Sequence, residues 1–216
     1  MKKAVFIILL LSSMNIIYCQ KVNYDSIDKA SYFKRIEQLN QYLNNRLPDL
    51  EFQDVHGGKV KLSDFSHKVL LIEIWATWCG PCVKSIPENQ KIYNRLRQNG
   101  ITDFEWINIS IDHDTVSWKK MVESKKIQGI NLIGNPKDIE RYYHIRGAPN
   151  YIFIDKNLRI QGFKLNFFRG ISLDYMIIKG TEGMNCGDAY KSMHIEGSNK
   201  SSEEFKAWLN SYWIDN

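Results

Sequence analysis

The strongest hydrophobic pattern in the chain is an apolar run over residues 69–75, in which Glu73 is the only charged residue. A run of strand length that is apolar at both odd and even positions predicts a buried central strand. Residues 81–99 carry apolar side chains at helical spacing and precede Gly100, which predicts a helix that ends there. The two segments together predict a core strand that leads directly into a helix.

Shorter patterns on both sides extend this order. Strands are expected at 60–62, 104–111, 151–154 and 158–160, and helices at 114–126, 136–143 and from Ser201 onward. The turn at His56–Lys59 joins residues 50–62 into a hairpin, and Asp155–Asn157 joins the last two strands. Helices that alternate with strands, followed by a closing hairpin, predict an α/β fold with a mixed central sheet and helices on both faces.

The N-terminal residues differ from the rest. Lys2 and Lys3 precede a short apolar stretch, an order typical of an export signal and shorter than a membrane-spanning helix requires. We expect a signal peptide at 1–19, a helical arm at 20–46 and the main domain at 47–216, so that the protein is periplasmic or secreted. Cleavage after Cys19 and lipid attachment to Cys19, which would tether the protein as a lipoprotein, both remain open.

Charge and cysteine content narrow the function. The formal net charge is +5 without a long basic run, so nucleic acid is not an expected partner. Of the four cysteines, Cys79 and Cys82 are separated by two residues, which suits thiol exchange better than a structural framework. A zinc site would need a second ligand pair, and the histidines are scattered, so no metal site is expected.

The pair stands between the predicted central strand and the predicted helix, in the order Trp78-Cys79-Gly80-Pro81-Cys82. The free N–H groups and positive end of a helix stabilise a thiolate, so Cys79 is the expected nucleophile. Pro81 suits a first helical turn, Gly80 allows a substrate backbone to approach, and Cys82 is the expected resolving thiol.

The segment Ile74–Cys82 resembles the signature of the thioredoxin superfamily, in particular its exported TlpA-like and ResA-like thiol:disulfide oxidoreductases, and Gly147-Ala148-Pro149 extends the resemblance. It implies a thioredoxin-like fold without a cofactor and a cis Pro149 facing the cysteines; the residues alone equally allow a trans proline. The substrate-binding residues that it implies are Trp78, Gly80, Pro81, Ala148 and Pro149.

The same resemblance implies a disulfide reductase for exported proteins, supplied by a membrane thiol electron donor, for example in cytochrome c maturation. An oxidant of exported thiols is the main alternative. A peroxiredoxin-like peroxidase would need its threonine three residues before the cysteine, whereas Thr77 is two before Cys79. A copper-binding module would need a third ligand near the pair.

Glu73 lies six residues before Cys79, where cytoplasmic thioredoxins carry a buried proton-transferring acid. A carboxyl group in an apolar strand has a raised pKa, so a catalytic proton role for Glu73 is expected; pairing with Lys59 or Lys68 is the alternative. Two features depart from the family. Ser85 stands where many relatives have an acid. The second departure is an insertion at about 163–200, which contains Cys186 and for which no structure is predicted. A substrate-gripping element, a mobile loop and a lineage-specific elaboration all remain open for it.

Overall fold

The computed structural model describes residues 29–165 and 171–198. Its strands are β1 (Glu51–Asp54), β2 (Lys59–Lys61), β3 (Val69–Trp75), β4 (Phe104–Ser110), β5 (Ile130–Ile133), β6 (Asn150–Ile154) and β7 (Ile160–Phe163). Its helices are α1 (Lys29–Asn40), a short 3₁₀ helix at Leu62–Phe65, α2 (Gly80–Gln98), α3 (Thr115–Lys125), α4 (Pro136–Tyr143), α5 (Ile171–Thr181) and α6 (Cys186–Ser198). The expected signal peptide and the helix predicted from Ser201 lie outside the described residues.

The strands form one mixed sheet in the order β2-β1-β5-β4-β3-β6-β7. β3 pairs in parallel with β4 and antiparallel with β6, and all seven of its residues are buried. This confirms the prediction of a buried central strand. Both predicted hairpins are also present, as the antiparallel pairs β1–β2 and β6–β7.

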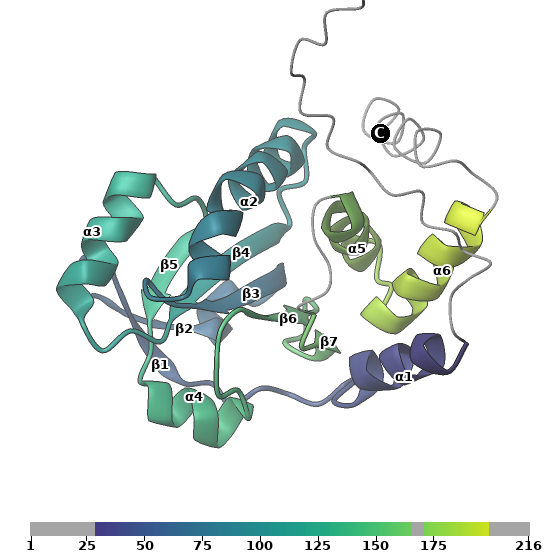
Figure 1. Cartoon of the computed structure of the whole chain (residues 1–216), viewed down its shortest axis with the longest axis horizontal. Coiled ribbons are helices and arrows are strands. Elements are labelled where there is room, and N and C mark those ends of the chain that lie inside the picture. The colour runs from purple at the N-terminus through teal and green to yellow at the C-terminus, as the bar shows by residue number, and fades with distance from the viewer. Residues whose placement is uncertain (1–28, 166–170, 199–216) are drawn as a thin grey trace, which may run out of the picture.

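Helices cover both faces of the sheet, as predicted (Figure 1). The β3–α2–β4 and β4–α3–β5 connections step across the sheet in the same direction, so the right-handed crossover rule places α2 and α3 on one face. α5 packs on this face beside α2, whereas α4 lies on the opposite face. The odd-numbered residues of β3 therefore face α2, and Leu70, Ile72 and Ile74 face the other layer.

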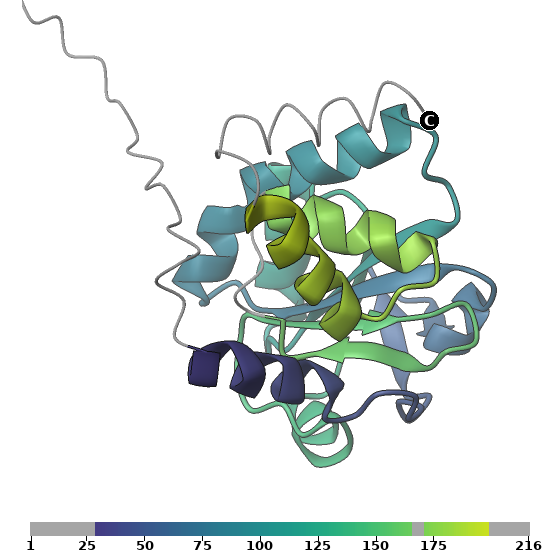
Figure 2. The same cartoon turned by 90° about the vertical axis from the view of Figure 1, so that its right-hand side faces the viewer.

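The segment 163–200, for which the sequence predicted no elements, forms helices α5 and α6 where it is described. α6 packs against α5, α1 and β7, and Figure 2 shows α1 next to α6 at this end of the molecule. Leu173, Met176 and Ile177 of α5 share a buried core with Leu39 of α1 and Leu71 of β3. This part of the insertion is thus an integral layer of the fold.

Glycine residues permit the close packing of this layer. A Cβ on Gly180 of α5 would overlap the ring of Phe153, and one on Gly162 of β7 would overlap the side chain of Cys186. These glycines therefore mark helix–sheet contacts, where the absence of a side chain lets the elements approach.

Candidate active site

Cys79 and Cys82 form a disulfide at the start of α2. Cys79 is the N-cap of the helix, and its Sγ accepts a hydrogen bond from the backbone N–H of Cys82 at 3.2 Å. Pro81 lies in the first turn, where its missing N–H leaves no helical hydrogen bond unmade. Sulfur at this position receives the free N–H groups and the positive end of the helix dipole, which favour a thiolate on Cys79 after reduction.

The residues around the disulfide differ strongly in solvent exposure. Cys82 is 1% exposed and Cys79 4%, but the neighbouring Trp78 is 63% exposed, and Gly80 and Pro81 are also exposed. A partner would therefore reach the pair over these three residues. Their predicted role in substrate binding fits this position.

The loop that carries Trp78 is held by a buried carboxylate, Asp112, just beyond the end of β4. Asp112 accepts hydrogen bonds from the backbone N–H of Thr77 at 2.9 Å and from the Thr77 hydroxyl at 2.7 Å. The hydroxyl of Ser110 also donates to Asp112 at 2.7 Å. This contact was not predicted from the sequence, although an acid directly after an apolar strand was a visible signal for it.

The Ala148–Pro149 peptide bond is cis, which confirms the expectation drawn from the family resemblance. Asn150 of β6 pairs with Ile74 of β3, so Pro149 lies beside the end of β3, just before the loop that leads to Cys79. Ala148 and Pro149 are half-buried. The fold therefore brings the two predicted substrate-binding segments to the same end of the sheet.

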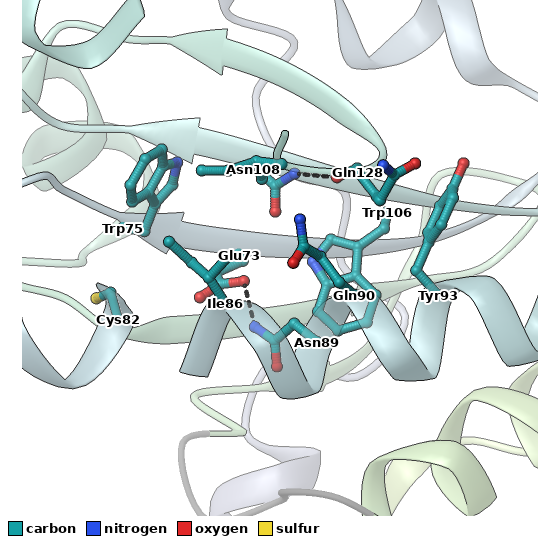
Figure 3. A pocket seen from close by; sticks show the side chains of 11 residues that line it. Glu73, Trp75, Cys82, Ile86, Asn89, Gln90, Tyr93, Trp106, Asn108 and Gln128 are labelled. Carbon is teal, nitrogen blue, oxygen red and sulfur yellow. Dashed lines mark hydrogen bonds between the residues drawn. The ribbon is translucent and has the colours of Figure 1, made fainter. Parts of the chain in front are cut away.

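Glu73 is buried on the α2 face of β3 and has partners from two other elements. Figure 3 shows one of them, Asn89 of α2. The Tyr151 hydroxyl of β6 donates to its carboxylate at 2.9 Å, and Asn89 Nδ2 of α2 donates at 3.1 Å. Burial raises the pKa of Glu73 from its ordinary value of 4.5 to about 7, and the hydrogen bonds oppose the rise only in part. Glu73 can therefore release or accept a proton near neutral pH.

The predicted alternative, an ion pair of Glu73 with Lys59 or Lys68, is wrong. Lys59 pairs with Glu51 at 2.8 Å, and Lys68 pairs with Glu105 at 3.0 Å. The strand places Lys68 at its entry, whereas Glu73 lies near its other end.

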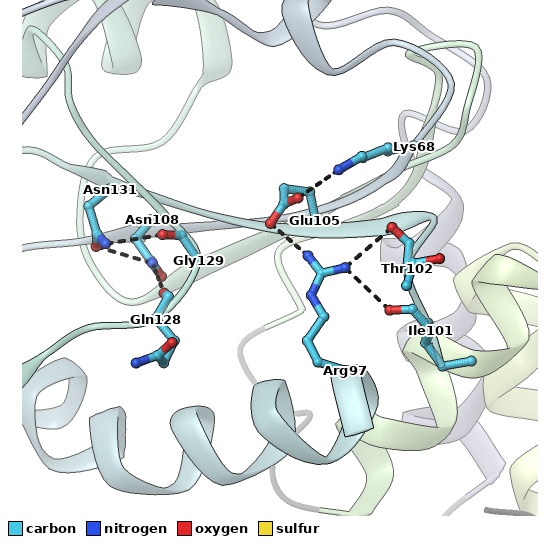
Figure 4. A network of polar contacts seen from close by, with 9 residues as sticks. All are labelled: Lys68, Arg97, Ile101, Thr102, Glu105, Asn108, Gln128, Gly129 and Asn131. Carbon is cyan, nitrogen blue, oxygen red and sulfur yellow. Dashed lines mark hydrogen bonds and ion pairs between the residues drawn. The ribbon is translucent and has the colours of Figure 1, made fainter. Parts of the chain in front are cut away.

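Glu105 of β4 shows how a buried carboxylate is neutralised elsewhere in this sheet (Figure 4). It accepts from Lys68 at 3.0 Å and from Arg97 of α2 at 2.8 Å. Among the described residues, the hydrogen-bond donors to Glu73 are neutral and no cation pairs with it. The two carboxylates thus differ in how their charge is compensated.

Glu73 and Cys82 line the same small cavity, of about 20 Å³, between α2 and the sheet. This volume accommodates a single water molecule. Trp75 and Trp106 line this cavity. Their indole N–H groups make no hydrogen bond of ordinary geometry with any described residue. The Trp106 indole nevertheless lies close enough to Glu73 to favour the carboxylate anion. The Glu73 carboxyl group and the inner thiol of the pair therefore line the same small cavity.

The remaining cysteine, Cys186, is buried at the start of α6 and forms no disulfide. Burial raises the pKa of its thiol above the ordinary value. A buried thiol of raised pKa suits neither a link to another chain nor exchange with the site. Among the described residues, no three His, Cys, Asp or Glu side chains are arranged to bind a metal ion.

Tyr151 and Asn89 were not identified from the sequence. Asn89 follows Cys82 by seven residues, so the two lie on one face of α2, and a polar residue on that face was an available signal. Tyr151 could be found only from the strand register, which places it directly opposite Glu73.

Comparison with known proteins assigns these features to a family. The family model described as Redoxin matches residues 43–169, more than half of the chain. The chain belongs to the Redoxin family. Within it, the protein is a thiol:disulfide oxidoreductase of the thioredoxin superfamily and is similar to the TlpA/ResA group, as its motif and fold indicate.

Individual relatives agree with this assignment. The thiol-disulfide oxidoreductase ResA of Bacillus cereus (strain ATCC 10987 / NRS 248) is 26% identical over 129 residues, which cover 60% of this chain and 72% of that protein. The thioredoxin domain of a thiol-disulfide oxidoreductase from Bacteroides vulgatus superposes with a TM-score of 0.54 at 26% identity, covering 66% of this chain and 98% of that one. A thiol:disulfide interchange protein from Bacteroides sp. has a TM-score of 0.56 at 28% identity, covering 67% and 93%.

Proposed function

We propose that this protein reduces disulfide bonds of exported proteins through the Cys79–Cys82 dithiol. The Cys79 thiolate attacks a substrate disulfide, releases one substrate thiolate and forms a mixed disulfide. Cys82, deprotonated, then attacks Cys79 Sγ, which releases the second substrate thiolate and closes the Cys79–Cys82 bridge. Two electrons pass from the dithiol to the substrate, and the proton of the Cys82 thiol passes to the Glu73 carboxylate.

The observation that carries this proposal is the asymmetry of the pair. Cys79 caps α2 beside exposed residues, whereas Cys82 is buried and shares its cavity with Glu73. The outer sulfur is therefore placed to attack a partner, and the inner thiol is placed to lose a proton to an internal base. With a pKa of about 7, Glu73 is close to half ionised at neutral pH and can also return the proton.

Trp78, Gly80 and Pro81 on one side and Ala148 and Pro149 on the other would hold an extended substrate segment across Cys79. No backbone–backbone hydrogen bond involves Ala148 among the described residues. Its N–H and C=O groups are thus available to a substrate backbone.

The cellular setting belongs to the same proposal. A signal peptide at 1–19 would export the protein to the periplasm or beyond, and a lipid on Cys19 would tether it to a membrane. A membrane thiol carrier would then return the pair to the dithiol, and cytochrome c maturation is one process that needs such a reductase. In the described part of the chain, no helix has the length and apolar character needed to cross a membrane.

An oxidant of exported thiols is the second candidate, because the same dithiol chemistry runs in either direction. The other two alternatives have less support. Thr77 donates its hydroxyl to Asp112, which removes it from the role that a peroxidase would require. For copper, no His, Asp or Glu of the described residues joins the pair as a third ligand.

The reduction potential of the Cys79–Cys82 pair tests the direction. We would equilibrate a Cys186→Ala variant with glutathione, because this substitution leaves Cys79 and Cys82 as the only cysteines among the described residues. A potential near that of thioredoxin, about −270 mV, is expected for a reductase, whereas a value near −120 mV would establish an oxidant instead. In parallel, Cys82→Ser protein should accumulate mixed disulfides with its substrates, and Cys79→Ser protein, the matched control, should not.

A further inference from the structure

The Glu73 carboxylate is held by one residue from each side of the site. Tyr151 belongs to the strand that begins just after Pro149, and Asn89 belongs to the helix that begins with the cysteines. Their hydrogen bonds to Glu73 are 2.9 and 3.1 Å long, and they reach different carboxylate oxygens, Oε1 and Oε2. Two donors on the two oxygens fix both the position and the plane of the carboxylate.

The backbone determines this arrangement. Glu73 and Tyr151 are directly paired across the antiparallel β3–β6 ladder, so their side chains leave the sheet on the same face and side by side. Asn89 Nδ2 also lies 3.4 Å from the Tyr151 hydroxyl, so the three groups form a closed cluster. The cluster adjoins the cavity that Cys82 lines.

We propose that Tyr151 and Asn89 are positioning residues that hold the Glu73 carboxylate toward Cys82 and stabilise its anion, so that they set the pH range in which Cys82 is deprotonated. This inference rests on the proposed thiol exchange and assigns roles to two residues outside the cysteine motif. Removing either donor destabilises the carboxylate relative to the carboxylic acid and shifts the titration of Glu73 to higher pH.

Few other groups can influence this titration. Besides Glu73, the titratable side chains that line the cavity are those of Cys82 and Tyr93, and no described residue lining it other than Glu73 is charged. Tyr151 is the further titratable group that contacts Glu73. α5 also packs against β3, but Asp174 pairs with Arg95 and Lys179 pairs with Glu182. A change at Tyr151 or Asn89 therefore acts on Glu73 without the intervention of a nearby cation.

The test is a titration of the Glu73 carboxyl by carbon-13 NMR in oxidised full-length protein, where Cys82 has no proton to exchange. Tyr151→Phe and Asn89→Leu should each raise the midpoint by about one pH unit. Tyr143→Phe is the matched control, because it also removes a buried tyrosine hydroxyl, one that donates to Pro48 O from α4 on the opposite face. The control should leave the midpoint unchanged.

The reduced proteins would then be assayed for the pH dependence of disulfide exchange with a glutathionylated peptide. A rate profile that moves to higher pH together with the carboxyl midpoint supports the proposal. An unchanged midpoint overturns it, and so does a shifted midpoint in an active enzyme whose rate profile stays in place. If the wild-type protein shows no exchange at all, the proposed function fails, while a shifted midpoint would still demonstrate that Tyr151 and Asn89 stabilise the Glu73 anion.

Discussion

Replacement of Glu73 by glutamine should stabilise the oxidised protein, and increasingly so as the pH rises. Burial raises the pKa of Glu73 from 4.5 to about 7, so the folded state binds this proton more tightly than the unfolded state. The contribution of the protonated Glu73 to the free energy of unfolding is therefore fully present below about pH 4.5 and is lost as the pH rises through 7. Each pKa unit corresponds to about 1.4 kcal/mol, so the ionised carboxylate costs about 3 kcal/mol at pH 8.

Glutamine avoids this cost because it is neutral and close to glutamate in size. It can keep both contacts, with its Oε1 accepting from Asn89 and its Nε2 donating to the Tyr151 hydroxyl, which turns to accept. Urea unfolding at pH 5 and pH 8 would measure the difference between Glu73→Gln and wild type. At pH 5 it should be below about 1 kcal/mol, and at pH 8 about 3 kcal/mol in favour of the variant. The oxidised state is used so that the Cys82 thiol does not titrate in the same range.

Glu105→Gln provides the matched control, a second buried carboxylate on the adjacent strand. Because Glu105 pairs with Lys68 and Arg97, its neutralisation should destabilise the protein by about 1–3 kcal/mol. If Glu73→Gln were also destabilising at pH 8, or its effect were the same at both pH values, the assignment of a raised pKa to burial of Glu73 would be refuted.

Two further predictions concern the packing of α5 and α6. Cys186 should resist a thiol reagent such as iodoacetamide in folded oxidised protein and should react once the chain is unfolded. The reason is that burial raises the pKa of its thiol and blocks access of the reagent. Rapid labelling of the native protein would contradict the buried position of Cys186. Gly180→Ala should lower the free energy of unfolding by about 1–3 kcal/mol, since the new methyl group overlaps Phe153. Gly147→Ala is the control, because a Cβ there meets nothing within 4 Å, and it should change the free energy of unfolding by less than about 0.5 kcal/mol. If thermal melts showed equal effects for the two variants, the close contact between α5 and β6 would be contradicted.

The local sequence was sufficient for much of the core. The apolar run at 69–75 predicted β3 with its observed bounds, and the spacing at 136–143 predicted α4 equally well. Such segments can be recognised because burial on both faces or on one helical face leaves a periodic pattern that does not depend on distant residues. β5 was missed because its four residues, Ile130–Ile133, are too few to establish a pattern.

The segment 163–200 was the largest omission. A mobile loop was one of three readings left open for it, but Gly180 of this segment and Gly162 just before it lie where a helix and the sheet approach each other too closely for a side chain. A glycine that opens a turn and a glycine that allows a tight contact look alike in the sequence. Only the packing of α5 and α6 on the sheet distinguishes the two.

The sequence alone determined the chemistry of the site, because Cys79, Gly80, Pro81 and Cys82 are neighbours in the chain and the strand and helix on either side are encoded locally. The tertiary structure decided which groups act on that chemistry. The distance from Glu73 to Tyr151 depends on the β3–β6 register, and its contact with Asn89 depends on how α2 lies across the sheet. A pKa is set by burial and by such neighbours, which the chain brings together only when it folds.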